Sequence, residues 1–284
     1  MPHARLHPLL YERLVREALL EDLGRAGDVT TDAVIPADAT ARAAILSRAD
    51  GRIAGLDVAL ATFRALDPSI VADVAVDDGC DVARGGTVAT LDGPARALLT
   101  GERVALNFLG HLSGIATATR DIAAAAGPFP GHIACTRKTI PGLRILQKYA
   151  VRMGGGLNHR FGLDDAVLIK DNHIAVAGGI AAAIGRVRGH VGHMVKIQVE
   201  VDTLDQLEEL IPLGVDAVLL DNMSPETMRR AVEMIGGRMI AEASGGITPQ
   251  SVAAVAASGI DLISMGWLTH SAPNLDLSLD IAVD

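Results

Sequence analysis

The residues of this chain best suited to chemistry lie in one cationic segment, Cys135 to Ile174, with the sequence CTRKTIPGLRILQKYAVRMGGGLNHRFGLDDAVLIKDNHI. Between Arg137 and His173 it holds four Arg, three Lys and two His against three Asp and no Glu, a net charge of +4 with neutral His. The whole chain carries −9. A cationic island in an acidic protein indicates a site for a small, multiply charged anion rather than a general attraction to polyanions.

The charges arrive as two pairs, Arg137-Lys138 and His159-Arg160, and as Lys170 after an apolar run. Each pair adjoins a turn, because Pro-Gly follows the first pair closely and three glycines precede the second. Glycine lets backbone N–H groups approach an anion, Arg presents a fork that matches carboxylate or phosphate, and Lys acts as a point charge. A solvated basic loop face is the alternative, and the pairing at turns favours the anion site.

The second half of the chain repeats a strand–helix unit. The strand-like segments MVKIQVEV, GVDAVLLDN, RMIAEASGG and GIDLISMG end near Glu200, Asp221, Ser244 and Gly266, at intervals of 21, 23 and 22 residues. This spacing is typical of a parallel β/α barrel. Since active sites in such barrels gather at the C-terminal ends of the strands, we expect these residues and Lys170 to share one rim.

The strand ends also predict what the site binds. Ser244-Gly245-Gly246 and Met265-Gly266 follow consecutive strands and indicate a phosphate site, with ordinary turn glycines as the alternative. Glu200 and Asp221 end apolar strands, where an unpaired carboxylate is costly to bury. Sugar hydroxyls or hydrated Mg²⁺ would satisfy them, and a structural salt bridge to Lys170 or another lysine is the alternative.

No nucleophile–base motif stands out in the sequence, which has no G-x-S-x-G, no H-E-x-x-H and no paired Cys/His cluster. The predicted site instead combines many cations, two acids and phosphate loops. Electrostatic positioning of a polyanionic substrate is the mechanism that such a set supports best.

Composition narrows the class of protein. A length of 284 residues with 49% hydrophobic content allows one large or two modest domains. An aromatic content of 2% and a net negative charge argue against a nucleic-acid-binding surface. The first 24 residues have charges scattered among apolar residues, unlike a signal peptide. The most apolar window, which ends at Arg186, is shorter than the ~18 residues that a membrane span needs. We expect a cytoplasmic protein without a membrane partner, in which Cys80 and Cys135 are reduced and hold no metal.

The first half predicts an α+β arrangement with an antiparallel sheet. A helical period covers Leu9 to Leu23, and GDVTTDAVIP then predicts a break. The stretches ATARAAILSRADGRIAG and VADVAVDDGCDVARGGTVATLDG suggest short strands on either side of a helix from Asp57 to Leu66. From Ala95 to about Ala126, small residues on a wide apolar face predict a long helix or a helix pair.

The motifs TRKT-PGLR, GGG-NHR-GL and LIKDNH, in this order, resemble the quinolinate phosphoribosyltransferase family, also called nicotinate-nucleotide pyrophosphorylase (carboxylating). The likeness extends from EDLGRAGDVTT at Glu21 to THSAPNLDLSLDI ending at Ile281. It implies a sandwich-like α+β N-terminal domain in residues 1–112, an incomplete β/α (TIM-like) barrel catalytic domain in 113–270, and a tail, 271–284, that returns to the N-terminal domain. It also implies a homodimer with shared active sites, or an assembly of such dimers.

The resemblance implies a reaction in which phosphoribosyl pyrophosphate and quinolinate give nicotinate mononucleotide, pyrophosphate and CO₂. The residues implied to bind the two quinolinate carboxylates are Arg137, Lys138, His159 and Arg160, with Arg103 from the partner subunit. Those implied to contact phosphoribosyl pyrophosphate, its ribose hydroxyls and a water-bridged Mg²⁺ are Lys138, Lys170, Glu200 and Asp221, the catalytic set. Those implied to hold the 5′-phosphate are Ser244, Gly245, Gly246, Met265, Gly266 and His270.

Two positions depart from the family pattern: Gly110-His111 stands where a basic or amide pair is expected, and Trp267 where a small residue is expected. The first could alter the subunit interface and the second the phosphate rim. Two other functions stay open: a paralogue that uses another pyridine carboxylate or a molybdenum-related metabolite, and a non-catalytic sensor of phosphoribosyl ligands.

Overall fold

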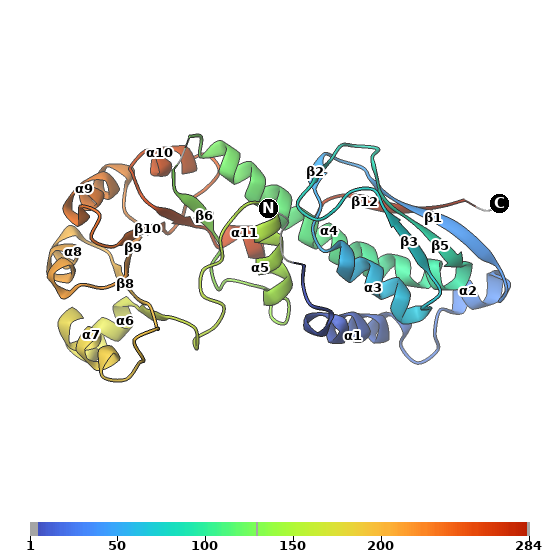
Figure 1. The fold of residues 1–284 in the computed structure, drawn as a ribbon, viewed down its shortest axis with the longest axis horizontal. Coiled ribbons are helices and arrows are strands. Elements are labelled where there is room, and N and C mark those ends of the chain that lie inside the picture. Colours follow the sequence, from blue (N-terminus) through green and yellow to red (C-terminus); the bar gives the residue numbers. More distant parts are fainter. Residues whose placement is uncertain (1–4, 129, 283–284) are drawn as a thin grey trace. The chain divides into compact units, whose positions relative to one another are not determined.

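A computed structural model describes residues 5–128 and 130–282, which pack as two units (Figure 1). Unit 1 comprises Met1–Arg120, Thr139–Gly155 and Leu268–Asp284, and unit 2 comprises Asp121–Lys138 and Gly156–Trp267. Residues 1–4 and 283–284, at the outer ends of the predicted N-terminal domain and tail, lie outside the described residues. The predicted boundaries after residues 112 and 270 stay predictions.

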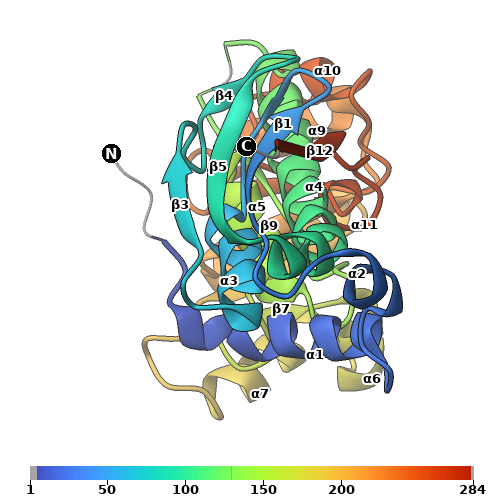
Figure 2. The same ribbon diagram turned by 90° about the vertical axis from the view of Figure 1, so that its right-hand side faces the viewer.

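Unit 1 contains the antiparallel sheet that the sequence predicts. Its four strands, in the order β12-β1-β5-β3, are β12 (Leu277–Ala282), β1 (Thr40–Ser47), β5 (Thr87–Pro94) and β3 (Val71–Val74), and a separate pair is formed by β2 (Gly51–Arg52) and β4 (Asp81–Val82). Helices α3 (Leu56–Leu66) and α4 (Ala95–Ala125) cover one face of the sheet (Figures 1 and 2). Ile45, Phe63, Leu91, Leu98 and Leu109 are fully buried in the core between these elements.

The remaining helices of unit 1 are η1 (Pro8–Leu10), α1 (Glu12–Leu23), α2 (Val29–Val34), α5 (Arg144–Met153) and α11 (Trp267–His270), which starts at the unit boundary. The predicted helices at α1 and α3 are confirmed, and the predicted long segment is the single helix α4. The break expected at GDVTTDAVIP is wrong, because that segment contains α2. Asp28 caps this short helix by accepting the Thr31 N–H at 2.9 Å and the Thr100 hydroxyl at 3.0 Å.

Glycines let neighbouring backbone approach α4 closely. A Cβ at Gly114 would collide with the Pro273 carbonyl oxygen, and one at Gly110 would lie 3.0 Å from the carbonyl oxygen of Leu275. The Leu275 N–H in turn donates to the Gly110 carbonyl at 2.9 Å. Gly110, one of the two departures noted above, therefore makes room for the segment that leads into β12.

Asp81 provides a test of electrostatics in unit 1. Its carboxylate accepts from Arg52 Nε at 2.9 Å and from Arg120 Nη1 at 2.8 Å, and the hydrogen bonds from Arg52 lower the pKa of Asp81 to about 2. A depressed carboxyl pKa stabilises the fold above the unfolded value of 3.8, and this stabilisation is lost as the pH falls through about 2.

We therefore expect Asp81→Asn to lower the melting temperature at pH 6, and the gap to wild type to narrow towards pH 2. The half-exposed carboxylate limits the loss at pH 6 to about 1 kcal/mol or less. Thermal melts across this pH range, with the exposed Asp73→Asn as control, measure the gap. An equal gap at both ends of the range would contradict the assignment.

Unit 2 contains six parallel strands in the order β6-β11-β10-β9-β8-β7. They are β6 (His132–Ala134), β7 (Val167–Ile169), β8 (Ile197–Val201), β9 (Ala217–Asp221), β10 (Ile240–Ser244) and β11 (Leu262–Ser264). Their helical connections are α6 (Asp171–Ala177), α7 (Ile180–Arg188), α8 (Leu204–Leu210), η2 (Ile211–Leu213), α9 (Pro225–Ile235) and α10 (Val252–Ala256). Among the described residues, β6 and β7 end this order and do not pair with each other, so the barrel is incomplete, as predicted. Within 5–128 and 130–282, no helix is long and apolar enough to cross a membrane.

Candidate active site

The carboxyl edge of the parallel strands in unit 2 brings most of the predicted site residues together. Glu200, Asp221 and Ser244 lie in the last two positions of β8, β9 and β10, while Lys170 directly follows β7. The predicted site residues that unit 2 contains are Arg137, Lys138, His159, Arg160, Lys170, Glu200, Asp221, Ser244, Gly245, Gly246, Met265 and Gly266. The clustering follows from the topology, because parallel strands end at the same side of their sheet.

Two arginines supply unpartnered donors. The Nε atoms of Arg137 and Arg160 are buried and have no hydrogen-bond partner within the described part of the chain. Arg160 is held in place by its Nη1, which donates to the Ala166 carbonyl at 2.9 Å, while burial and the nearby charge of Arg137 lower the pKa of Arg160. Because a buried donor without a partner costs about 1–3 kcal/mol, the pair favours an anion that accepts from both guanidinium groups.

His159, beside Arg160, is tied to the barrel interior. Its Nδ1 accepts the backbone N–H of Arg160 at 2.8 Å, and its Nε2 lies 3.0 Å from Gln198 Oε1 and 3.7 Å from Glu242 Oε2. Gln198 Nε2 also donates to Glu242 Oε2 at 2.8 Å. A chain of three polar side chains therefore connects the basic loop to strands β8 and β10.

The two predicted carboxylates have different surroundings. Glu200 is buried and accepts from Lys170 Nζ at 3.0 Å, so the salt bridge considered as its alternative role is present. Asp221 accepts from the side-chain amide of Asn222 at 2.6 Å. Burial, and next the charge of Asp202, raise the pKa of Asp221, while Lys170 and Lys138 oppose the shift. A cation or hydroxyl donors near Asp221 would stabilise its charged form.

The glycines after β10 and β11 have local packing reasons. Gly245 has a φ of +93°, and a Cβ there would collide with the side chain of Asn222, itself at a φ of 53°. Gly266 leaves room for Lys138, because a Cβ would lie 2.7 Å from Lys138 Cδ. Gly246 has a φ of +59° and open space around it. Close packing thus explains Gly245 and Gly266 whether or not a phosphate binds there, and the phosphate role stays a prediction.

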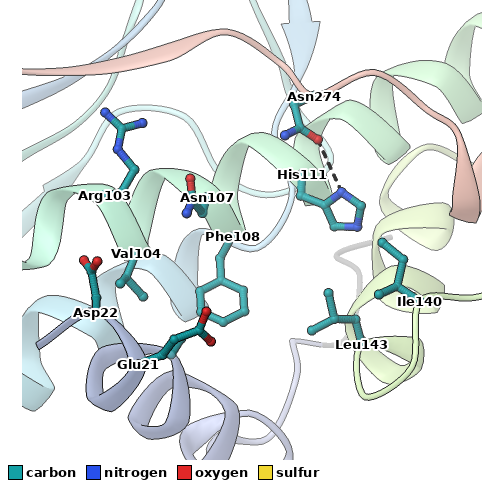
Figure 3. Close-up of a pocket in the computed structure, with 11 residues that line it drawn as sticks. Glu21, Asp22, Arg103, Val104, Asn107, Phe108, His111, Ile140, Leu143 and Asn274 are labelled. Carbon is teal, nitrogen blue, oxygen red and sulfur yellow. Dashed lines mark hydrogen bonds between the residues drawn. The ribbon is translucent and has the colours of Figure 1, made fainter. Parts of the chain in front are cut away.

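Arg103 and His270 belong to unit 1. Arg103 is an exposed residue of α4 and lines a pocket of about 400 Å³ (Figure 3). His270 is exposed, and its Nδ1 lies 2.6 Å from the Ser271 hydroxyl. The other residues that line the pocket are Ala18, Glu21, Asp22, Val104, Asn107, Phe108, His111, Ile140, Leu143 and Asn274.

His111, the second residue of the Gly110-His111 departure, is held on both sides of its ring. Gln147 Nε2 lies 2.8 Å from its Nε2. On the other side of the ring, Asn274 Oδ1 lies 3.3 Å from its Nδ1 (Figure 3). An amide N–H only donates, so Nε2 accepts and the proton is on Nδ1. Burial lowers the pKa of His111, which favours this neutral ring.

Sequence reasoning missed Gln198 and Glu242. It considered the polar residues at the ends of the strands, whereas these two lie two positions earlier than Glu200 and Ser244. Alternate residues of a strand share a face, so both could have been found as polar residues on the same face as the predicted site.

Comparison with known proteins places the chain in a family. The family domains described as "Quinolinate phosphoribosyl transferase", N-terminal and C-terminal, match residues 28–113 and 115–280. A Bacillus subtilis protein named "Probable nicotinate-nucleotide pyrophosphorylase [carboxylating]" is 42% identical over 278 residues, covering 98% of this chain and 96% of its own length. A Methanothermobacter thermautotrophicus protein of the same name is 44% identical over 275 residues, covering 94% and 98%.

Solved structures agree with this assignment. The crystal structure of NadC from Streptococcus pyogenes is 39% identical to this chain, covers 99% of both chains and superimposes with a TM-score of 0.96. The predicted fold class, an α+β domain followed by an incomplete barrel, is confirmed by this similarity, and so is the resemblance carried by the TRKT, NHR and LIKDNH motifs. The chain belongs to the quinolinate phosphoribosyltransferase family.

Proposed function

We propose that this chain transfers the phosphoribosyl group of phosphoribosyl pyrophosphate to quinolinate with decarboxylation, giving nicotinate mononucleotide, pyrophosphate and CO₂ in NAD biosynthesis. The observation that carries the proposal concerns the buried Nε groups of Arg137 and Arg160, which have no hydrogen-bond partner in the described part of the chain. They lie in the unit whose strand edge also holds Lys170, Glu200 and Asp221. Two guanidinium groups suit a substrate with two adjacent carboxylates. The similar proteins whose names specify carboxylation support the same reaction.

In the first step, the quinolinate nitrogen forms a bond to ribose C1 as the bond from C1 to the pyrophosphate oxygen breaks. Negative charge develops on the leaving pyrophosphate, which Lys138 and Lys170 stabilise as point charges. Positive charge develops on the ribose ring, and the carboxylates of Glu200 and Asp221 accept hydrogen bonds from its hydroxyls. Arg137, Lys138 and Arg160, with His159 beside them, hold the two quinolinate carboxylates and thereby fix the attacking nitrogen.

In the second step, the bond from ring carbon 2 to its carboxylate breaks and CO₂ leaves. The electron pair stays on carbon 2, where the adjacent quaternary pyridinium nitrogen stabilises it until a proton is taken up.

We propose that the 5′-phosphate is held by the loops after β10 and β11, with Ser244, Gly245, Gly246, Met265, Gly266 and His270 as its contacts.

Mg²⁺ fits the donors at this edge. The described residues contain no group of three or more His, Cys, Asp or Glu side chains that could hold a metal by themselves. Mg²⁺ needs no such group, because it keeps several waters and is held by one or two carboxylates together with substrate phosphates. Asp221, whose pKa is raised by burial, and Glu200 would hold it through water. When bound, Mg²⁺ neutralises charge on the pyrophosphate.

Gly266→Ala tests the placement of Lys138 and of the loop after β11 at the site of phosphoribosyl pyrophosphate. The new methyl group would displace the Lys138 side chain, and a charged hydrogen bond contributes about 1.5–3 kcal/mol, so we expect KM for phosphoribosyl pyrophosphate to rise about tenfold. Initial rates with the second substrate saturating measure it. Gly192→Ala, where the Cβ would meet open space, is the matched control. An unchanged KM in a folded Gly266→Ala protein would contradict the proposed roles of both Lys138 and the loop after β11.

We further propose a cytoplasmic homodimer in which Arg103 completes the active site of the partner subunit, with neither nucleic acid nor membrane as a partner. The support for the dimer is the resemblance of the sequence to its family and the exposed position of Arg103 on α4. An assembly of several such dimers is compatible with the same arrangement.

Substrate choice tests the proposed reaction. Purified protein with Mg²⁺ and phosphoribosyl pyrophosphate is given quinolinate, nicotinate or pyridine-2-carboxylate, and pyrophosphate release is followed. Release with quinolinate alone is expected, because each of the other acids lacks one carboxylate and leaves cationic groups of the site without a partner. Turnover of another acid in its place would indicate the paralogue, and binding of phosphoribosyl pyrophosphate without turnover of any acid would indicate the sensor.

A further inference from the structure

We infer that Gln198 and Glu242 are positioning residues, which fix the ring of His159 and through it the loop that carries Arg160. The inference deepens the proposed function and rests on it where substrate binding is concerned. Neither residue was among the site residues predicted from the sequence. We propose that they affect the binding of the quinolinate carboxylates and have little effect on the binding of phosphoribosyl pyrophosphate.

The hydrogen bonds fix the tautomer of His159. Its Nδ1 faces the Arg160 N–H at 2.8 Å and therefore accepts. The proton of the neutral ring is then on Nε2, which donates to Gln198 Oε1 at 3.0 Å. The orientation of the Gln198 amide is set in turn by Glu242, whose Oε2 accepts from Gln198 Nε2 at 2.8 Å. Each member of the chain defines the orientation of the next.

The burial of this chain argues for a role beyond stability. Gln198 is 8% exposed and Glu242 is 2% exposed, and Glu242 Oε1 has no hydrogen-bond partner among the residues that the structure describes. A buried carboxylate with an unsatisfied oxygen costs free energy that an apolar residue at the same barrel position would avoid. The stability of the core therefore does not explain a glutamate at position 242, whereas the positioning of polar groups in a site does.

The same contacts change the role expected of His159. Both of its ring nitrogens are used within unit 2, so the neutral ring has no free N–H to offer quinolinate. Its bond to the Arg160 backbone instead positions the Arg160 guanidinium group. The Nε of that group is buried and has no hydrogen-bond partner within residues 5–128 and 130–282, and its Nη1 donates to the Ala166 carbonyl. His159 therefore acts on the substrate through Arg160.

The first test separates binding of the two substrates. Glu242→Ala and Gln198→Ala are expected to raise KM for quinolinate about tenfold and to leave KM for phosphoribosyl pyrophosphate within about twofold, since loss of one charged hydrogen bond has this size. Glu242→Gln, which keeps an oxygen acceptor, should recover most of the loss. Ser258→Ala removes another buried polar group of unit 2 and should change neither constant. Equal increases in both constants, or no increase in folded variants, would overturn the inference.

The second test does not depend on the substrate. Nitrogen-15 NMR distinguishes the two neutral histidine tautomers, and the His159 signals are those lost in His159→Asn. In the wild-type protein at pH 7.5 we expect the Nε2–H tautomer, and a mixture in Gln198→Ala. A single unchanged tautomer in folded Gln198→Ala would overturn the positioning role. If the wild-type protein does not use quinolinate, the proposed function fails while this measurement still decides the role of Gln198.

Discussion

Replacing Arg160 with Ala is expected to lower kcat/KM for quinolinate at least about tenfold, because a hydrogen bond to a charged group contributes roughly 1.5–3 kcal/mol. The effect is large because the Arg160 Nε is buried and without a partner among the described residues, so the anion is the group that would pair with it. The kcat/KM of Arg160→Lys should lie between the values of the wild-type protein and of Arg160→Ala, since Lys keeps the charge but loses the planar fork.

Steady-state kinetics with phosphoribosyl pyrophosphate saturating measure the effect of Arg160→Ala. Arg229→Ala, an exposed arginine on α9 in the same unit, is the control and should leave the constants unchanged. A folded Arg160→Ala protein with wild-type quinolinate kinetics would exclude Arg160 from the carboxylate site.

Mixing two inactive variants is expected to restore activity if Arg103 serves the partner subunit. Arg103→Ala and Lys170→Ala homodimers each lack one essential residue in both sites. In a mixed dimer, one site combines the intact Arg103 with the intact Lys170 and the other site has neither, so about one site in two should work. Activity before and after subunit exchange measures the recovery.

The control mixture combines Arg137→Ala with Lys170→Ala. Both residues lie in unit 2 and are proposed to serve the same site of one subunit, so every site in a mixed dimer lacks one of them. This mixture should stay inactive. Recovery in the control, or none with Arg103→Ala, would contradict the shared site.

Strands β8 to β11 were predictable because each is a short apolar run with a polar or glycine residue near its end, repeating about every 22 residues. A parallel sheet buried on both faces leaves this signal in the sequence. Helix α2 was not predictable in this way, because six residues cannot show a clear helical period, and the contact of its cap residue Asp28 with Thr100 joins positions 72 apart.

The site was predictable as a set of charges but not as a set of contacts. Arg137, Arg160 and Lys170 could be identified from charge and spacing alone. The pairing of Lys170 with Glu200, the orientation of His159 by Gln198 and the collision that requires glycine at position 245 depend on side chains that are distant in sequence. Local pattern carries no information on such contacts until the strand order and register are known.

The most direct test of the proposed reaction is the ratio of CO₂ to pyrophosphate formed from quinolinate labelled with carbon-13 in its 2-carboxylate. With Mg²⁺, phosphoribosyl pyrophosphate and the purified protein, we predict one labelled CO₂ for each pyrophosphate, and nicotinate mononucleotide without the label. Pyrophosphate release without labelled CO₂, or no release from quinolinate at all, would contradict a decarboxylating phosphoribosyl transfer.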